Sequence, residues 1–448
     1  MLHLPRVALG AVQPATDRQA ICWAMLEALV QSGCQVQHFL AHACFTPRNA
    51  ALAITGVASR HLDTWLMPKA VCREIFVHGC AGRDLAVVEG EFTASDADDP
   101  PAGSRLDMLC DWLDLPRLVV LDASKLHDCQ WPDRPNQIDG VLLDRVGNAA
   151  EAFQLQTALE ALWDVPVLGM LEELPRLRAG LAQLPCGAAP SREMCAELGE
   201  AFLRFSRPDR IRELAGRRDL PPIAPAVFPI PEQEPSQPSL TVAVAYDAAF
   251  NCYFPDALDL LELHGAKIVD FSPLRDEVLP DADVVYLGCG HPDRYAEALS
   301  GNHCMLLALR NHIRGGRRVY AEGGGLAYLC QKLQTPRGEW VPMVGALPAY
   351  ARANPQGAPP VPVELTFAQG NWLGSAGSRV RGYLNTHWLL DPSGPLTGLL
   401  GEPGHEFDLV GQYQVIGSRL HLNFAAQADF LQAFFQPHCP TLAYSGAS

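Results

Sequence analysis

A run of prolines near the middle of the chain limits what the sequence can fold into. Seven of the 18 residues from Pro221 to Pro238 are proline. Proline fixes φ and lacks a backbone N–H, so neither a helix nor a central strand can pass through this segment. The sequence therefore predicts two domains, residues 1–220 and 239–448, joined by a linker over residues 221–238. A length of 448 residues agrees with two or three domains.

Short apolar runs alternate with helix-length segments on both sides of the linker. This alternation is typical of buried parallel strands in an α/β sheet, so the predicted fold class is two doubly wound parallel-sheet domains. The predicted strands are Arg6–Val12, Cys34–Phe39, Leu85–Val88, Leu118–Leu121, Gly140–Leu143, Val165–Leu168, Leu240–Tyr246, Lys267–Phe271, Asp283–Gly288 and Arg317–Ala321. The predicted helices are Arg18–Ser32, Ala257–His264, Arg294–Arg314 and Leu326–Lys332, the last of which follows three consecutive glycines.

Charge and hydropathy exclude several classes of function. The 34 basic and 50 acidic residues leave a net charge of −16, which disfavours binding to a nucleic-acid backbone. No apolar run approaches the roughly 18 residues that cross a bilayer, so we expect no membrane partner and a cytoplasmic location. The 14 cysteines form no CxxC pair, and we expect most of them to be small buried side chains in a reducing compartment.

Several segments, in order along nearly the whole chain, carry a family resemblance. They are Arg60-His-Leu-Asp-Thr-Trp-Leu-Met67, Asp84-Leu-Ala-Val-Val-Glu-Gly90, Gly140-Val-Leu-Leu-Asp-Arg-Val-Gly147, Val165-Pro-Val-Leu-Gly169, Tyr286-Leu-Gly288, Tyr320-Ala-Glu322, Gly324-Gly-Leu326 and Pro342-Met-Val-Gly345. With these segments the chain resembles cobyrinic acid a,c-diamide synthases. The resemblance implies a dethiobiotin-synthetase-like P-loop domain that binds ATP, Mg²⁺ and a tetrapyrrole, followed by a flavodoxin-like class I glutamine-amidotransferase domain.

The nucleotide loop departs from the family pattern. Where the family has a glycine-rich Walker A loop ending in Gly-Lys-Thr, this chain has Gly10-Ala-Val-Gln-Pro-Ala-Thr-Asp-Arg-Gln19. Arg18 takes the place of the lysine, while Asp17 brings a negative charge and Gln19 has no hydroxyl for Mg²⁺. Because a P-loop needs free amides, a lysine and a hydroxyl, ATP binding in the family's manner is not expected.

Two acidic residues keep the spacing of the family's metal-binding stretch. Glu89 and Asp96 match the family's acids near Mg²⁺ and the reacting carboxylate, although the residues between them differ. Two alternatives stay open. The pair either holds a divalent cation at the end of a strand or consists of ordinary solvated acids in a surface loop, which we favour.

The amidotransferase domain departs from the pattern at its nucleophile. The family's Ala-Glu-Cys-Gly-Gly reads Ala321-Glu-Gly-Gly-Gly325 here, so Gly323 replaces the cysteine. His421 takes the position of the family's catalytic histidine. Cys289, in a turn that is glycine-rich in the family, and Cys330, two helical turns beyond Gly323, are not expected to substitute for the thiol. The domain is therefore predicted not to hydrolyse glutamine by the family mechanism, because that mechanism needs a thiolate nucleophile.

Histidines offer a further candidate site for a metal or a tetrapyrrole. His38, His42, His61 and His78 lie in the first domain, and the HxxxH spacing of the first two spans a predicted strand end and loop. Because that spacing places two ligands on one face only in a helix, a shared site is disfavoured. His42 is the first choice for a ligand, since it replaces a glycine of the family's substrate cleft.

Three functions are compatible with this pattern. The leading hypothesis is a non-catalytic or diverged family relative that binds a corrinoid or another tetrapyrrole, or that acts as a partner subunit. The alternative is ATP-dependent amidation of the a- and c-carboxylates of cobyrinic acid or a related tetrapyrrole, with glutamine or free ammonia, in which Arg18 serves the phosphates and Glu89 and Asp96 hold Mg²⁺. The third is an interaction protein that forms a homodimer or binds another enzyme.

Overall fold

The computed structural model describes residues 2–13, 17–45, 49–92, 103–126, 131–185, 187–225, 227–228 and 240–436. The chain divides into two compact units, Met1–Ala226 and Val227–Ser448. The boundary falls within the proline-rich segment, of which residues 229–238 lie outside the described part. Each unit is described by itself below.

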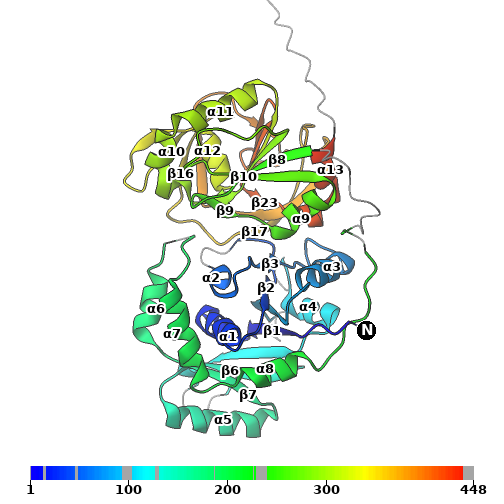
Figure 1. Ribbon diagram of the computed structural model, residues 1–448, viewed down its shortest axis with the longest axis vertical. Coiled ribbons are helices and arrows are strands. Elements are labelled where there is room, and N and C mark those ends of the chain that lie inside the picture. Colours follow the sequence, from blue (N-terminus) through cyan, green and yellow to red (C-terminus); the bar gives the residue numbers. More distant parts are fainter. Residues whose placement is uncertain are drawn as a thin grey trace, which may run out of the picture. The chain divides into compact units, whose positions relative to one another are not determined.

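The first unit alternates strands with helices (Figure 1). Its elements are β1 (Arg6–Ala11), α1 (Gln19–Gln31), β2 (Val36–Leu40), α2 (Ala51–Thr55), β3 (Arg60–His61), α3 (Lys69–Gly79), β4 (Leu85–Glu91), α4 (Leu106–Leu113), β5 (Arg117–Asp122), η1 (Ala123–Lys125), β6 (Gly140–Val146), α5 (Ala149–Trp163), β7 (Val167–Glu172), α6 (Pro175–Ala182), α7 (Arg192–Leu203) and α8 (Pro208–Ala215).

The strands of the first unit form one seven-stranded sheet in the order β3-β2-β4-β1-β5-β6-β7. Every neighbouring pair is parallel. The predicted parallel α/β sheet is therefore confirmed. The six strands expected in this unit are present, the last beginning at Val167 rather than at Val165.

Helices cover both faces of this sheet, because alternate side chains of each strand point to opposite faces. Val7, Leu9 and Val87 belong to a core that includes buried side chains of α1, α2, α6, α7 and α8. Figure 1 shows α1 and α7 side by side on this face. On the other face, Val119 and Leu121 pack with α5, and α4 approaches Gly10 so closely that a Cβ there would lie 2.9 Å from Leu106 Cδ2.

The second unit begins with the same alternation and ends with several short strands. Its elements are β8 (Leu240–Ala245), β9 (Phe250–Cys252), α9 (Pro255–Leu263), β10 (Ala266–Phe271), β11 (Val284–Leu287), β12 (Cys289–Gly290), η2 (Pro292–Tyr295), α10 (Ala296–Gly301), α11 (His303–Arg314), β13 (Arg318–Glu322), α12 (Gly324–Leu329), β14 (Cys330–Gln334), β15 (Trp340–Pro342), β16 (Leu347–Ala353), β17 (Val361–Thr366), β18 (Arg379–Leu384), β19 (Trp388–Pro392), β20 (Thr397–Gly398), β21 (Leu409–Gln412), β22 (Val415–Ser418), β23 (Leu420–His421), η3 (Phe424–Ala426) and α13 (Ala428–Phe435).

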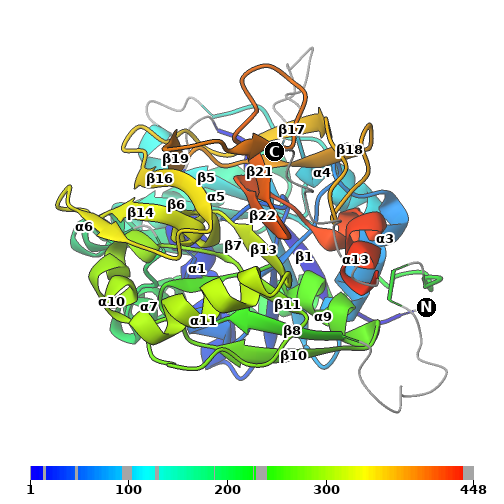
Figure 2. The same ribbon diagram turned by 90° about the horizontal axis from the view of Figure 1, so that it is seen from above.

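The main sheet of this unit has the order β10-β8-β11-β13-β22-β21-β20 (Figure 2). Its first five strands are parallel, and β21 and β20 extend it in antiparallel fashion. The remaining strands of this unit form a four-stranded sheet (β15-β14-β16-β19), a three-stranded sheet (β17-β18-β23) and a two-stranded sheet (β12-β9). The sequence did not predict these smaller sheets.

Two predicted helices of the second unit were wrong in extent. The helix expected over Arg294–Arg314 is divided into η2, α10 and α11, and Asn302 begins α11 by accepting a hydrogen bond from the N–H of Met305. The helix expected to reach Lys332 ends at Leu329, because from Cys330 onward the chain pairs as β14 with β15 and β16.

Most cysteines of the described residues are buried, as expected from the sequence. Nine of the eleven cysteines in the described residues are buried, and Cys252 and Cys304 are the more accessible ones. No helix in the described ranges combines the length and the hydropathy that a membrane crossing requires.

Candidate functional site

Arg18, the residue at the position of the family's lysine, lies immediately before α1 and turns toward the end of β4. Its Nε atom lies 3.2 Å from Glu89 Oε1, and its Nη1 atom lies 3.1 Å from Glu91 Oε1. The neighbouring Asp17 accepts a hydrogen bond from the N–H of Gln19 at 3.1 Å. The structure thus engages Arg18 with two carboxylates of its own chain. Pro14, from the same loop, lies outside the described residues.

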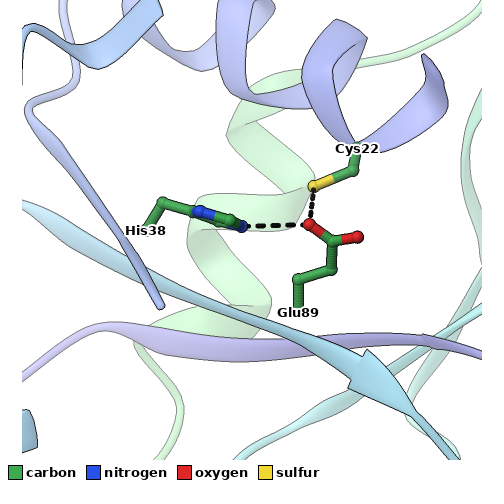
Figure 3. A group of neighbouring side chains, drawn as sticks. All are labelled: Cys22, His38 and Glu89. Carbon is green, nitrogen blue, oxygen red and sulfur yellow. Dashed lines mark hydrogen bonds and ion pairs between the residues drawn. The ribbon is translucent and has the colours of Figure 1, made fainter. Parts of the chain in front are cut away.

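Glu89 is the centre of a buried polar cluster (Figure 3). Its Oε2 atom lies 3.2 Å from His38 Nε2 and accepts a hydrogen bond from the thiol of Cys22 at 3.5 Å. The three residues come from β4, β2 and α1, whose packing brings them together beneath the first turns of the helix. The other ring nitrogen of His38 lies 2.9 Å from Ser59 Oγ.

The cluster keeps Glu89 ionised. Burial opposes its charge, but the hydrogen bond with His38 and the charge of Arg18 lower its pKa to about 2. Although burial works against the guanidinium, Glu89 and Glu91 raise the pKa of Arg18. Glu89 and Arg18 therefore form a buried ion pair. Removal of either partner would destabilise the folded protein, because the other charge would stay buried without compensation.

This geometry corrects the expectation that Glu89 is a solvated acid of a surface loop. Glu89 lies within β4 and is only 6% exposed. Its expected companion, Asp96, lies outside the described residues. The donors next to Glu89 are an imidazole, a thiol and a guanidinium, a set that does not suit Mg²⁺, which prefers oxygen ligands.

The four histidines of the first unit have different surroundings. His42 has a pKa lowered to about 4, first by burial and then by the charge of Arg18. His61 packs edge-on against Phe45, with ring centroids 5.6 Å apart, and His78 lies in the last turn of α3. Only His38 belongs to one of the potential metal-ligand groups of the described residues, and its neighbour Cys22 was missed from the sequence. Helix packing and strand register bring Cys22 to Glu89, and no sequence motif indicates this contact.

In the second unit, Gly323 occupies a tight turn between β13 and α12. Its φ of +50° and ψ of −106° lie in a region that side chains rarely adopt. The two following glycines permit close packing, since a Cβ at Gly324 would lie 2.6 Å from Gly290 O and one at Gly325 would lie 2.2 Å from Leu287 O. The strand, sharp turn and helix that present a nucleophile in other α/β proteins are therefore formed here, with a glycine at the tip.

Cys289 fills the space beside that glycine. Its Sγ atom lies 2.9 Å from the point where a Cβ at Gly323 would stand. Cys289 comes to this position because β11 and β13 are neighbouring parallel strands, so the turns at their ends meet. The thiol therefore lies beside the elbow, and the elbow itself carries no side chain.

The Cys289 thiol lacks the surroundings of an activated nucleophile. Burial raises its pKa well above the ordinary value, and the charge of Glu322 acts in the same direction. Its sulfur lies 4.0 Å from Glu322 Oε2. Burial in turn raises the pKa of Glu322 to about 8, despite hydrogen bonds from the Tyr320 hydroxyl and the Leu422 N–H. A reactive thiol needs a positive neighbour that lowers its pKa.

His421 lies in β23, is 1% exposed and faces Asn385. The Asn385 side-chain amide lies 3.1 Å from His421 Nε2, an arrangement in which the amide donates and Nε2 accepts. Cys330, which the sequence placed two helical turns beyond Gly323, instead begins β14, and its thiol contacts Leu326 O at 3.5 Å. The expected histidine is thus present in the core of the unit, and the elbow beside it carries no side chain.

Comparison with known sequences points to one family. A sequence model of the CobB/CobQ-like glutamine amidotransferase domain matches residues 241–428. The chain is 30% identical to cobyrinate a,c-diamide synthase of Salmonella typhimurium over 391 residues, which cover 84% of this chain and 84% of that protein. It is 30% identical to the synthase of Methanosarcina barkeri over 387 residues, with 78% and 77% covered.

Two similar solved structures each match about one domain. A crystal structure of a glutamine amidotransferase aligns at 19% identity with a TM-score of 0.34, covering 43% of this chain and 96% of that one. The MinD cell division protein of Aquifex aeolicus aligns at 11% identity with a TM-score of 0.28, covering 47% and 95%. On the identity and coverage of its sequence relatives, the chain belongs to the cobyrinate a,c-diamide synthase family.

Proposed function

We propose that this chain is a diverged member of its family that binds a corrinoid or a related tetrapyrrole and does not hydrolyse glutamine. One observation carries the proposal: the elbow residue is Gly323, and the space a nucleophile would need there contains the protonated thiol of Cys289. Glutaminase chemistry of the family type needs a thiolate on that turn and a base within hydrogen-bond reach. Here Nε2 of the candidate base, His421, lies at hydrogen-bond distance from Asn385.

The surroundings of Arg18 support the further proposal that the chain does not bind ATP in the manner of a P-loop. Arg18 is 14% exposed and is paired with Glu89 and Glu91, so its charge is already balanced within the chain. Among the described residues, Asp17, Gln19 and Arg178 help to line a cavity of about 70 Å³. Pockets for small ligands usually measure about 300–1,000 Å³. Polyphosphate binding would require Arg18 to leave two carboxylates and would bring Asp17 close to the phosphates.

The tetrapyrrole part of the proposal depends on kinship with the synthases and not on a described cleft. Because a fold by itself does not specify a ligand, the titration described below tests this part of the proposal directly. If no tetrapyrrole binds, a role as a partner subunit for another enzyme takes its place.

Catalytic amidation is the second candidate, and the identity to known synthases over most of the chain favours it. In that case the chain amidates the a- and c-carboxylates of cobyrinic acid or a related tetrapyrrole, with free ammonia as the nitrogen donor. This function requires Arg18 to turn from Glu89 to the phosphates. It also requires Mg²⁺ to bind with the nucleotide, although the described neighbours of Glu89 do not suit that ion.

A combined binding and activity experiment separates these functions. The purified protein is titrated with a corrinoid and with sirohydrochlorin, with and without ATP and Mg²⁺, while absorbance and thermal unfolding are followed. A ligand that binds the native state raises the unfolding temperature. We expect tetrapyrrole alone to shift both signals, and we expect no release of glutamate from glutamine.

The matched control is the double variant Gly323→Cys/Cys289→Gly, which returns the thiol to the elbow. Measurable glutamate release by the unchanged protein would contradict the loss of glutaminase. Tetrapyrrole binding that requires ATP and Mg²⁺, or ATP hydrolysis that depends on ammonia and tetrapyrrole, would contradict a binding-only role and establish the second candidate. The same ATP hydrolysis should then be lost in Glu89→Gln.

A further inference from the structure

A second group of metal-ligand side chains lies beside the elbow of the second unit. His291 follows β12, Asp293 lies in η2, and His387 lies between β18 and β19. One ligand atom of each lies within 4.8 Å of the others. Because His291 and His387 are 96 positions apart in the sequence, the fold and not local spacing brings them together.

Two atoms of this group lack the partners that buried polar atoms normally have. Asp293 Oδ1 and His387 Nε2 are both buried, and neither makes a hydrogen bond in the described part of the chain. A buried polar atom without a partner costs about 1–3 kcal/mol. The rings of His291 and His387 meet edge to face, with centroids 5.4 Å apart, so the two imidazoles do not satisfy each other. The arrangement is that of a site whose occupant supplies the missing interactions.

Burial favours the neutral form of both imidazoles. Burial, followed by the charges of His387 and Arg294, lowers the pKa of His291 to about 4. Burial also lowers the pKa of His387. A metal ion binds the neutral imidazole and the ionised carboxylate. Burial raises the pKa of Asp293, so its ionised form is costly here without a cation beside it.

We propose that His291, Asp293 and His387 bind a divalent transition-metal ion such as Zn²⁺ or Co²⁺. Two imidazole nitrogens and one carboxylate oxygen suit these ions, whereas Mg²⁺ and Ca²⁺ prefer oxygen ligands. Three protein ligands leave at least one coordination position for water or a substrate. Exposure of all three residues is intermediate, which permits an ion to enter from solvent.

The site adjoins the turn that carries Gly323. Pro292, between two of the ligands, packs against that turn, since a Cβ at Gly324 would lie 2.7 Å from Pro292 Cδ. A metal here would stand next to the elbow that lacks a thiol. The proposal goes beyond tetrapyrrole binding and does not depend on it.

The cluster of Cys22, His38 and Glu89 is the weaker candidate and serves as the internal comparison. Its ligand atoms also lie within 4.8 Å of one another. Unlike the group at His291, it is satisfied without a metal, because Glu89 is paired with Arg18 and bonded to His38 and Cys22. A metal would have to displace these interactions.

The test is a titration of the chelator-treated, full-length protein with Co²⁺, followed by visible absorbance and by calorimetry, and then competition with Zn²⁺. We expect one Co²⁺ per chain, with d–d bands and without the near-ultraviolet sulfur-to-cobalt band that Cys22 would add. His387→Gln and His291→Gln should each weaken binding at least about tenfold, since even outer partners of a metal site contribute tenfold or more. His38→Gln, the matched change in the other cluster, should leave binding unchanged.

Thermal unfolding of each variant in the presence of chelator shows whether it is folded, and Asp293→Asn gives an independent third ligand variant. Binding that survives in all three ligand variants would overturn the proposal. So would loss of binding in His38→Gln alone, or the absence of Co²⁺ and Zn²⁺ binding in the unchanged protein.

Discussion

The elbow of the second unit allows a quantitative test of the contact between Cys289 and Gly323. In Gly323→Ala the alanine would have to adopt a φ near +50° and a ψ near −106°. Its Cβ would lie 2.9 Å from Cys289 Sγ. A side chain in such a strained backbone region costs about 1–3 kcal/mol. Insertion of an extra carbon into a filled core costs about 1–3 kcal/mol more. We expect Gly323→Ala to lower the free energy of unfolding by about 2–6 kcal/mol.

The steric part can be separated from the backbone part by a double-mutant cycle. Cys289→Ala removes the sulfur and leaves its own Cβ 3.7 Å from the new carbon, an ordinary contact distance. In that background Gly323→Ala should retain only the backbone cost of about 1–3 kcal/mol. The coupling free energy between the two changes is therefore expected to be about 1–3 kcal/mol.

Urea unfolding of the four full-length proteins measures this coupling, and hydrogen exchange of a peptide that covers α12 shows whether the loss is local to the elbow. A cost of Gly323→Ala that is the same in both backgrounds, to within about 0.5 kcal/mol, would refute the argument. The sulfur would then not occupy the position that the geometry gives it.

Three further predictions concern the buried ionisable groups. Because Glu89 has a pKa of about 2 when folded against an ordinary 4.5, its ionised form stabilises the protein above pH 4.5, and this stability, about 3 kcal/mol, should be lost as the pH falls toward 2. Urea unfolding across this range should show the loss relative to Glu89→Gln, and parallel pH curves would contradict it. Glu322 should give the opposite pH dependence of stability. Its pKa of about 8 lies above the ordinary 4.5, so the free energy of unfolding should fall as the pH rises from 4.5 toward 8. Calorimetry should find this fall in the unchanged protein and not in Glu322→Gln, and an equal fall in both would exclude Glu322 as its source. Arg18→Gln should cost about 3–5 kcal/mol in urea unfolding, and much less in a Glu89→Gln background, since it leaves a buried carboxylate without its cation. A cost below about 1 kcal/mol would mean that the pair is solvated.

The parallel strands of the two main sheets could be predicted from the sequence, because buried parallel strands are continuous apolar runs between turn residues. The end of α12 could not be predicted. Cys330 to Lys332 continue a pattern that suits a helix, and pairing with β16 overrides it. The short strands beyond Gln334 carry weaker patterns, since many of their residues are half-buried.

The candidate sites were predicted in part. The family resemblance predicted four positions of the candidate sites: Gly323, His421, Arg18 and Glu89. It did not predict which side chains contact them. Contacts of Glu89 with Arg18, His38 and Cys22 depend on the rotation of α1 and the register of β2 and β4. The contact between Cys289 and Gly323 could have been predicted from the strand pattern. Gly288-Cys289-Gly290 and Gly323-Gly-Gly325 each follow a parallel strand, and these two strands are neighbours, so their turns meet.

The position of the Cys289 thiol also restricts how this unit could carry a nucleophile at the elbow. A single change of Gly323 to cysteine would drive its side chain into the sulfur of Cys289, so the intermediate would be destabilised before it gained any activity. A path that first removes Cys289 meets a smaller obstacle, because a smaller residue there leaves room at the elbow. Packing at the elbow thus constrains the order in which these two residues can be substituted.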